Sequence, residues 1–141
     1  PEVQAKLRSV LGRVYTNLGL YDQAAPLLRR SLAQQTVLHG PVAASVAETM
    51  DLLGIALTRM DRFDEAEPLL RGALEQHRRQ FGNTHAATAQ TLEHLATLHE
   101  ERNDYAKAEP VHREVLAIRQ ALLGDTAVEV ANAMSNLGLI L

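Results

Sequence analysis

The sequence predicts an all-α fold, a right-handed solenoid of antiparallel helix pairs with about 3.5 repeats and seven helices. Two observations predict it. Several residues recur together with a period of 42 positions, and apolar residues within each period recur at steps of three and four, as on one face of a helix. No run alternates with the period of two that a half-buried strand requires. A single helix pair cannot bury its apolar faces alone, so we expect stacked pairs to bury them together.

The repeat is visible in several columns of the sequence. Pro26, Pro68 and Pro110 recur at a spacing of 42 residues. The same register aligns three further sets, which are Tyr21, Phe63 and Tyr105; Gly40, Gly82 and Gly124; and Leu11-Gly12, Leu53-Gly54, Leu95-Ala96 and Leu137-Gly138. The columns predict one domain over residues 1–141, with repeats at 1–40, 41–82 and 83–124 and a half repeat at 125–141. The chain starts at Pro1 and ends in an apolar run, which suggests a fragment of a longer chain.

Each repeat is predicted to form two helices joined by a turn. The first helix of the second repeat is expected over residues 42–60, and the second helices over 21–38, 63–81 and 105–123. Gly19, Asp61 and Asn103 are residues that tolerate turn conformations, and they separate the two helices of each pair. Gly40, Gly82 and Gly124 supply the helix stops. A seventh helix over 126–141 opens a fourth pair and should leave an apolar end, formed by Met134, Leu137, Ile140 and Leu141.

Two kinds of residue inside the predicted helices need a reason. Gly12 and Gly54 cost a helix about 1 kcal/mol each, and we expect them to be kept because they let a neighbouring helix approach closely. Pro26 is expected near the end of the first turn of its helix, where few backbone donors have partners and proline costs least.

Composition excludes several classes of function. The chain has 141 residues and no cysteine, which removes disulfides, thiolate metal sites and a cysteine nucleophile. The net charge of −3 does not indicate a positively charged surface that would bind nucleic-acid phosphates, so no nucleic acid partner is expected. No stretch is long and apolar enough for a membrane span, and no leader is visible, so we expect no membrane partner and a cytoplasmic location.

The repeated residues resemble a known family. The Leu-Gly of the first helices, the aromatic residue after the turn, and Ala24, Ala66 and Ala108 resemble the tetratricopeptide repeat (TPR). The 42-residue length, the Ala-Glu-Pro-Leu-Leu phrase at 66–70, and Phe81-Gly82-Asn83-Thr84-His85 followed by Ala89 are similar to the kinesin light chain type of repeat. The resemblance implies a TPR solenoid, and an Arg to Lys ratio of 12 to 2 indicates a bacterial source.

The resemblance also implies a site. In the family the first helices line a concave groove that binds an extended peptide or a helix of a partner protein. Matching columns assign the peptide-binding groove to Lys6, Ser9, Arg13, Asn17, Glu48, Asp51, Ile55, Arg59, Gln90, Glu93, Thr97, Glu100, Glu101, Asn132 and Ser135. These positions lie opposite the apolar stripe of each helix, so periodicity predicts that they are exposed.

Charge varies along this groove. Lys6 and Arg13 make its first part basic, whereas Glu48, Glu93 and Glu100 make the middle and far end acidic. A protein or peptide partner with a basic stretch is therefore expected there, because complementary charge favours association and specificity.

The histidines and carboxylates give little sign of chemistry. His94 and His99 are five residues apart, which does not place two metal ligands on one helix face. His99 and His112 occupy otherwise apolar columns, so we expect them to meet inside the third helix pair. No phosphate loop, nucleophile elbow or His-Glu-x-x-His motif is present. We expect no enzyme activity, no metal and no cofactor.

The leading hypothesis is a non-catalytic protein-interaction scaffold. Two alternatives stay open: a structural or regulatory TPR array within a larger bacterial signalling protein, and a kinesin light chain-like adaptor associated with a cytoskeletal, tubulin-like filament. Self-association through the open C-terminal helix is also expected of this chain.

Overall fold

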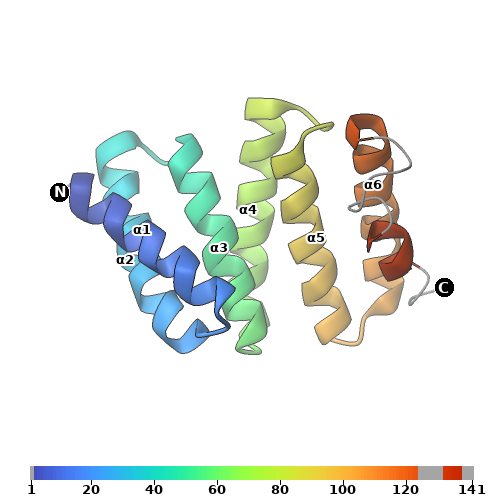
Figure 1. The fold of residues 1–141 in the computed structure, drawn as a ribbon, viewed down its shortest axis with the longest axis horizontal. Helices are drawn as coiled ribbons and strands as arrows, with labels where there is room; N and C mark the ends of the chain where they lie inside the picture. Colours follow the sequence, from blue (N-terminus) through green and yellow to red (C-terminus); the bar gives the residue numbers. More distant parts are fainter. Residues whose placement is uncertain (1, 124–131, 138–141) are drawn as a thin grey trace. The chain divides into compact units, whose positions relative to one another are not determined.

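The computed structural model describes residues 2–123 and 132–137, which form helices joined by short turns (Figure 1). Within the described residues the helices are α1 (Glu2–Asn17), α2 (Tyr21–His39), α3 (Ala44–Arg59), α4 (Phe63–Phe81), α5 (Ala86–Glu101) and α6 (Tyr105–Leu123). Residues 132–137 are also helical. No strand occurs in the described part of the chain, so the predicted all-α class is confirmed.

The predicted helix boundaries agree closely with the observed ones. α4 and α6 span the predicted residues, and α2 runs one residue further than predicted, to His39. α3 begins at Ala44, two residues later than predicted, because Ala43 has the extended backbone of a helix N-cap, with φ −68° and ψ 150°. Gly124 and much of the predicted seventh helix lie outside the described residues.

The turn residues adopt the conformations for which their types are suited. Gly19 has a φ of 78°, and Asp61 and Asn103 each have a φ of 62°. Asn and Asp tolerate this left-handed region better than other residues with a Cβ atom. Gly40 ends α2 with a φ of 88°, and its N–H donates to the Thr36 carbonyl at 3.0 Å. These predicted turns and stops are confirmed.

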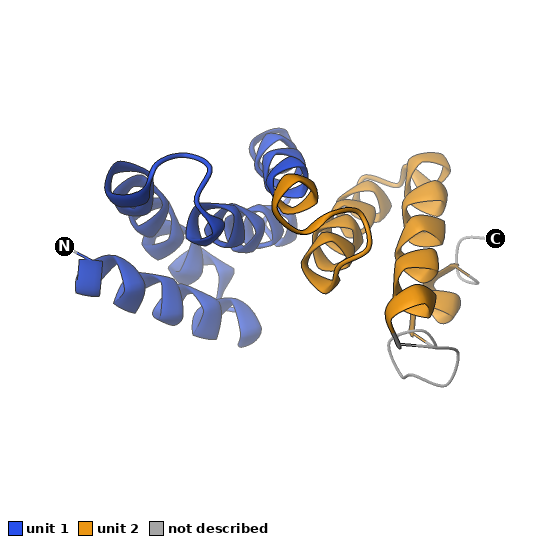
Figure 2. Ribbon diagram, turned by 90° about the horizontal axis from the view of Figure 1, so that it is seen from above, with its two compact units in different colours: residues 1–76 blue, residues 77–141 orange. Residues whose placement is uncertain are grey.

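The chain divides into two compact units, residues 1–76 and residues 77–141 (Figure 2). In the first unit, α1 packs on α2, α2 packs on α3, and α1 also touches α3. In the second unit, α5 packs on α6.

Close helix contacts in the first unit depend on glycine. A Cβ atom on Gly12 would lie 2.6 Å from Leu28 Cδ2, and one on Gly54 would lie 2.6 Å from Leu70 Cδ2. Both distances are too short for real atoms, so the leucine side chains occupy the space that a Cβ would need. The predicted reason for these helix-interior glycines is confirmed.

The prolines lie deeper in their helices than predicted. The Ala24 N–H already donates to the Leu20 carbonyl, so Pro26 comes after the first turn of α2. Without an N–H, Pro26 leaves the Asp22 carbonyl without its helical donor. The expectation of a position within the first turn was wrong, and the helix continues past the ring nonetheless.

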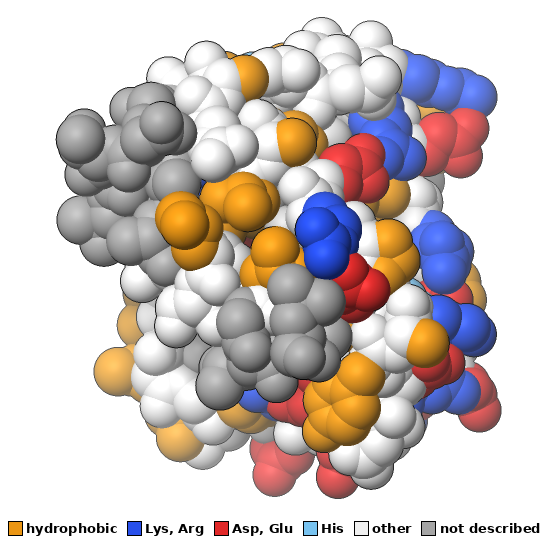
Figure 3. Space-filling view, turned by 90° about the vertical axis from the view of Figure 1, so that its right-hand side faces the viewer, with side chains coloured by type: hydrophobic (Ala, Val, Ile, Leu, Met, Phe, Trp, Pro, Cys, Tyr) orange, Lys and Arg blue, Asp and Glu red, His pale blue; other side chains and the backbone are white. Residues whose placement is uncertain are grey.

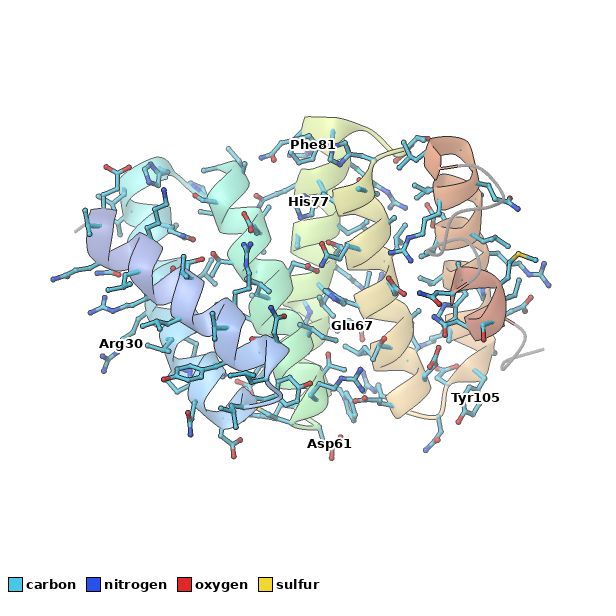
Figure 4. All side chains as sticks on the ribbon, in the orientation of Figure 1. Arg30, Asp61, Glu67, His77, Phe81 and Tyr105 are labelled. Carbon is cyan, nitrogen blue, oxygen red and sulfur yellow. The ribbon has the colours of Figure 1, made fainter. Side chains whose placement is uncertain are left out.

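Arginine–glutamate pairs connect successive second helices within each unit. Nη2 of Arg29 on α2 lies 3.0 Å from Oε1 of Glu65 on α4. Nη2 of Arg78, at the end of α4, lies 2.6 Å from Oε1 of Glu114 on α6. Arg30, beside the first of these pairs, extends away from α2 (Figure 4).

Candidate functional site

A pocket of about 430 Å³ lies in the first unit, where α1, α2 and α3 meet. α1 contributes most of its lining, α2 contributes Gln35 and His39, and α3 contributes Ser45 and Glu48. Five residues assigned to the groove from the sequence line it: Lys6, Ser9, Arg13, Asn17 and Glu48. The fold therefore brings this part of the predicted site together around one cavity.

Part of the pocket wall is apolar. Ala5, Val10 and Val14 line it from α1. Val10 is 52% exposed and Val14 is 45% exposed, although both are valines. Aliphatic side chains that stay open to solvent in a cavity are typical of surfaces that another molecule covers.

Some of the charged residues of the pocket form ion pairs with one another. Arg13 on α1 forms an ion pair with Glu48 on α3, which joins two first helices directly. Glu2 Oε1 and His39 Nε2 lie 3.8 Å apart. Lys6 is exposed, and among the described residues no carboxylate forms an ion pair with it. One cation in the pocket is therefore available to a ligand.

A buried amide supports the inner wall. Gln35 is buried, and its Oε1 lies 2.7 Å from the hydroxyl of Thr49, which is itself buried. The same hydroxyl lies 2.9 Å from the Ser45 carbonyl. The Gln35–Thr49 hydrogen bond connects α2 to α3 beside the pocket, whereas the contact with Ser45 lies within α3.

The structure corrects the predicted exposure of two groove residues. Asp51 is 5% exposed and Ile55 is 8% exposed, whereas both were expected to face solvent. α3 is covered on more than one side, because its buried residues run round the helix instead of along one stripe. α1 buries only Ala5 and Gly12, so its groove residues stay accessible because few neighbours cover this helix, whereas the expected exposure fails at these positions of α3. Arg59 is exposed, as predicted.

Three of the predicted groove residues of the second unit contact their own chain. Glu93 Oε2 lies 2.7 Å from Arg119 Nη2, and Thr97 Oγ1 donates to the Glu93 carbonyl at 3.1 Å. Glu100 pairs with His112. Gln90, Asn132 and Ser135 are exposed and Glu101 is half-buried. The predicted acidic character of this region is therefore partly neutralised within the chain.

The helix pair of the second repeat has a simple apolar arrangement. Leu70 packs on Gly54, and Thr58 Oγ1 donates to the Gly54 carbonyl at 2.8 Å. The first repeat has the same arrangement with Gly12, Thr16 and Leu28. The threonine hydroxyl is satisfied within its own helix and leaves the leucine in apolar surroundings.

The third repeat differs at all three of these positions. Ala96, Glu100 and His112 replace the glycine, threonine and leucine, and His112 is 2% exposed with its Nε2 against Glu100 Oε1. His99 is also buried, Glu100 is a partner of His112, and the expected contact between His99 and His112 stays a prediction. The described residues contain no group of three or more metal-binding side chains.

Sequence reasoning missed the role of His85. Its Nδ1 accepts a hydrogen bond from the Ala87 N–H at 3.0 Å, so it caps the N-terminus of α5. Its ring stacks on Phe81 with centroids 4.3 Å apart, and Phe81 stacks on His77 at 6.0 Å. Figure 4 shows His77 and Phe81 at the same end of α4. Histidine is not among the residue types preferred at an N-cap, so the residue type gave no signal of this cap.

The predicted apolar end is partly visible. Met134 is 55% exposed, whereas Leu137 is half-buried. Ile140 and Leu141 lie outside the described residues. The face drawn in Figure 3 carries apolar side chains among charged ones.

The comparisons with known proteins agree on the fold. A tetratricopeptide repeat model matches residues 3–71 and 45–121. BtubC (BKLC) from P. vanneervenii is similar over 99% of this chain, with a TM-score of 0.88 and 25% sequence identity. Nearly identical TPR-like repeats from Podosopora anserina, described as kinesin light chain repeats, match 96% of this chain with a TM-score of 0.84 and 18% identity. The comparison with curated proteins finds no match.

The chain spans 56% of the BtubC structure and 64% of the Podosopora anserina structure. None of the described helices is both long and apolar enough to cross a membrane. Repeats of the matched kind generally mediate protein–protein interaction, and proteins built from them are typically non-catalytic scaffolds. Two overlapping matches that together cover residues 3–121, and a fold shared along nearly the whole chain with solved repeat proteins, show that this chain belongs to the tetratricopeptide repeat family.

Proposed function

We propose that this chain is a non-catalytic protein-interaction module that binds a peptide or a helix of a partner protein along its first helices. The observation that carries the proposal is the pocket between α1 and α3, because five residues assigned to the groove from the sequence line it. A cavity with aliphatic walls and a few polar groups is typical of a site that binds another molecule, here a segment of a partner protein. We also propose that residues 1–141 form a single TPR domain that acts in the cytoplasm.

The charge preference of the site is part of the same proposal. Glu93 and Glu100 each have a partner in their own chain, so a basic ligand would share or displace Arg119 or His112. Such competition reduces the gain in affinity from each carboxylate. We therefore assign charge complementarity in the second unit mainly to specificity and association rate, with a basic segment of the partner as the preferred ligand.

Affinity capture, followed by binding measurements with the purified partner, tests this function. Gln90→Lys and Asn132→Lys add positive charge to exposed positions on first helices of the second unit, and Gln23→Lys with Gln120→Lys is a matched pair on second helices. We expect the first pair to weaken binding about threefold to tenfold and the second pair to leave it unchanged.

Two results would contradict the proposal in different ways. If the second-helix pair weakens binding and the first-helix pair does not, the binding face is on the second helices. If the first-helix pair strengthens binding, the face is correct and the preference for a basic partner is wrong.

A second candidate is a kinesin light chain-like adaptor that associates with a cytoskeletal, tubulin-like filament. The similarity to BtubC (BKLC) and to kinesin light chain repeats favours it. Co-sedimentation with polymerised bacterial tubulin-like filaments tests it. Saturable sedimentation supports the adaptor, and a chain that stays in the supernatant at all filament concentrations rejects it.

A further inference from the structure

The outer face of α1 carries a stripe of aliphatic side chains that are open to solvent. The six residues of this outer stripe are each between 38% and 79% exposed: Val3, Leu7, Val10, Leu11, Val14 and Leu18. Leu18 directly follows α1, and its N–H still donates to the Val14 carbonyl at 3.0 Å. At about 100° per residue, the outer stripe lies opposite Ala5 and Gly12, the buried residues of α1. Six leucines and valines on one helix face form a patch that another protein surface is expected to cover.

The same columns are buried in the first helices of the later repeats. The columns of Leu7, Leu11 and Val14 there carry residues that are at most 2% exposed, namely Thr49, Leu53 and Ala56 in α3 and Thr91, Leu95 and Leu98 in α5. In α3 the cover is α2, because Thr49 donates to Gln35 across this face. This face of a first helix is therefore one on which a further helix packs, and among the described residues α1 presents it open to solvent.

The side chains of the outer stripe narrow the choice of that helix. Leu7 stands where α3 has Thr49, so α1 has no hydroxyl to donate to a residue such as Gln35. The column of Gln35 carries His77 in α4 and Arg119 in α6. Each second helix of this chain would therefore bury a polar side chain against Leu7, which is unfavourable without a hydrogen bond. The outer stripe instead favours a helix whose own face is aliphatic throughout.

The spacing of the outer stripe is the same in both directions. Its six residues are separated by 4, 3, 1, 3 and 4 positions. A two-fold axis between Val10 and Leu11 therefore places a valine of one copy opposite a leucine of the other in each pair, which are Val3 with Leu18, Leu7 with Val14, and Val10 with Leu11. A smaller side chain opposite a larger one lets facing helices interdigitate. The helix that matches this face is thus α1 of a second copy, in the antiparallel direction.

We propose that the chain forms a two-fold homodimer in which the outer stripe of α1 packs antiparallel against the same stripe of a second copy. Burial of the aliphatic side chains supplies the affinity. The inference goes beyond the proposed function. Val10 and Val14 also line the pocket, so the dimer covers one edge of the pocket and a ligand there competes with the second copy.

Analytical ultracentrifugation of the chain over a concentration series tests the dimer. The contact is one helix face on each side, which is smaller than a standard interface. We therefore expect the mean mass to rise from that of one chain to that of two between about 1 µM and about 1 mM. Leu7→Glu places two carboxylates in the contact and should weaken the dimer at least about tenfold. Because Leu7 is exposed, this variant should keep the circular dichroism spectrum of the parent chain.

Two control variants make the same kind of change elsewhere. Val37→Glu alters an exposed valine of α2, and Met134→Glu alters the apolar end near the C-terminus. Both should leave the association constant unchanged, because neither residue belongs to the outer stripe.

Disulfide cross-linking tests the antiparallel pairing, since the chain has no cysteine of its own. Val10→Cys lies beside the two-fold axis and should form disulfide dimers under mild oxidation. Val3→Cys alone should not, because its two copies would lie about 22 Å apart along the helices, whereas a disulfide needs Cα atoms within about 7 Å. A mixture of Val3→Cys and Leu18→Cys chains should form the mixed disulfide.

Three results would overturn the inference. A mass of one chain at every concentration would leave the outer stripe to a helix outside residues 1–141 or to another protein. A dimer that Met134→Glu abolishes and Leu7→Glu does not would place the contact at the C-terminal end. Disulfide formation by Val3→Cys alone, as fast as by Val10→Cys, would contradict the antiparallel two-fold arrangement. The proposed function survives each of these results, because a monomer presents the same pocket.

Discussion

Single side chains fix the local geometry at the ends of helices. His85 both caps α5, through its Nδ1, and stacks on Phe81. An acceptor side chain at the N-cap satisfies a backbone donor that the helix itself leaves without a partner. His85 therefore joins the end of α4 to the start of α5 within the second unit.

Substitution of His85 separates these two contributions. His85→Ala should lower the free energy of unfolding by about 1 kcal/mol, because it removes the cap acceptor. His85→Asn keeps an acceptor and should recover most of this loss, as measured by urea denaturation. Equal destabilisation by both variants would assign the effect to the ring stack and not to the cap.

Glu65 is a second residue whose surroundings change its chemistry. The hydrogen bond from Arg29 has the largest effect and lowers the pKa of Glu65; burial opposes it, and further contributions from Arg62 leave the pKa lowered. A carboxyl group with a lowered pKa in the folded state stabilises the fold at pH values above its unfolded pKa. That stabilisation is lost as the pH falls through the lower, folded pKa.

An NMR titration of the Glu65 side-chain carboxyl measures this effect. In the parent chain the midpoint should lie below that of an unperturbed glutamate, and Arg29→Gln should move it upward. The difference in stability between the parent and Arg29→Gln should shrink as the pH falls through the Glu65 midpoint. If Arg29→Gln leaves the midpoint unchanged, Arg29 does not donate a hydrogen bond to the Glu65 carboxylate in solution.

At the scale of helix pairs, the third repeat exchanges an apolar contact for a polar one. Leucine fits against a glycine in the first two repeats, where a Cβ would come within 2.6 Å. The third repeat has Ala96 at the glycine position and His112 at the leucine position. The side chains at these two positions therefore change together within the pair, which individual helix propensities do not reveal.

A double-mutant cycle tests this coupling. His112→Leu alone should destabilise the chain by about 1–3 kcal/mol, because the leucine would crowd the Ala96 Cβ and Glu100 would lose its partner. Adding Ala96→Gly should recover part of that loss, although Ala96→Gly alone is destabilising by about 1 kcal/mol. Additive effects in thermal or chemical unfolding would contradict the proposed fit between the two positions.

The elements that sequence reasoning predicted best are those with a local cause. Turns at Gly19, Asp61 and Asn103 follow from the conformations that these residue types tolerate, and the helices follow from apolar spacing. The buried Asp51 and Ile55 could not be predicted in the same way, because their burial depends on which neighbours cover α3. The partners of Glu93 and Glu100 likewise depend on contacts between helices.

At the scale of the whole molecule, the 42-residue period predicted stacked helix pairs, and the resemblance of the repeated residues predicted the family. The first repeat of the candidate site also agrees with the sequence, because α1 is covered on few sides and its groove residues stay accessible. The later repeats agree less well, since packing and ion pairs within the chain occupy several of the predicted positions.

The central claim is that the first helices, and the pocket of the first unit in particular, bind the partner protein. Methyl NMR of the chain, titrated with the purified partner, tests it most directly. We expect the largest shifts at the methyl groups of Ala5, Val10 and Val14, and little change at Val37 and Leu122 on the second helices. Shifts concentrated at Val37 and Leu122, with Val10 and Val14 unchanged, would contradict the account.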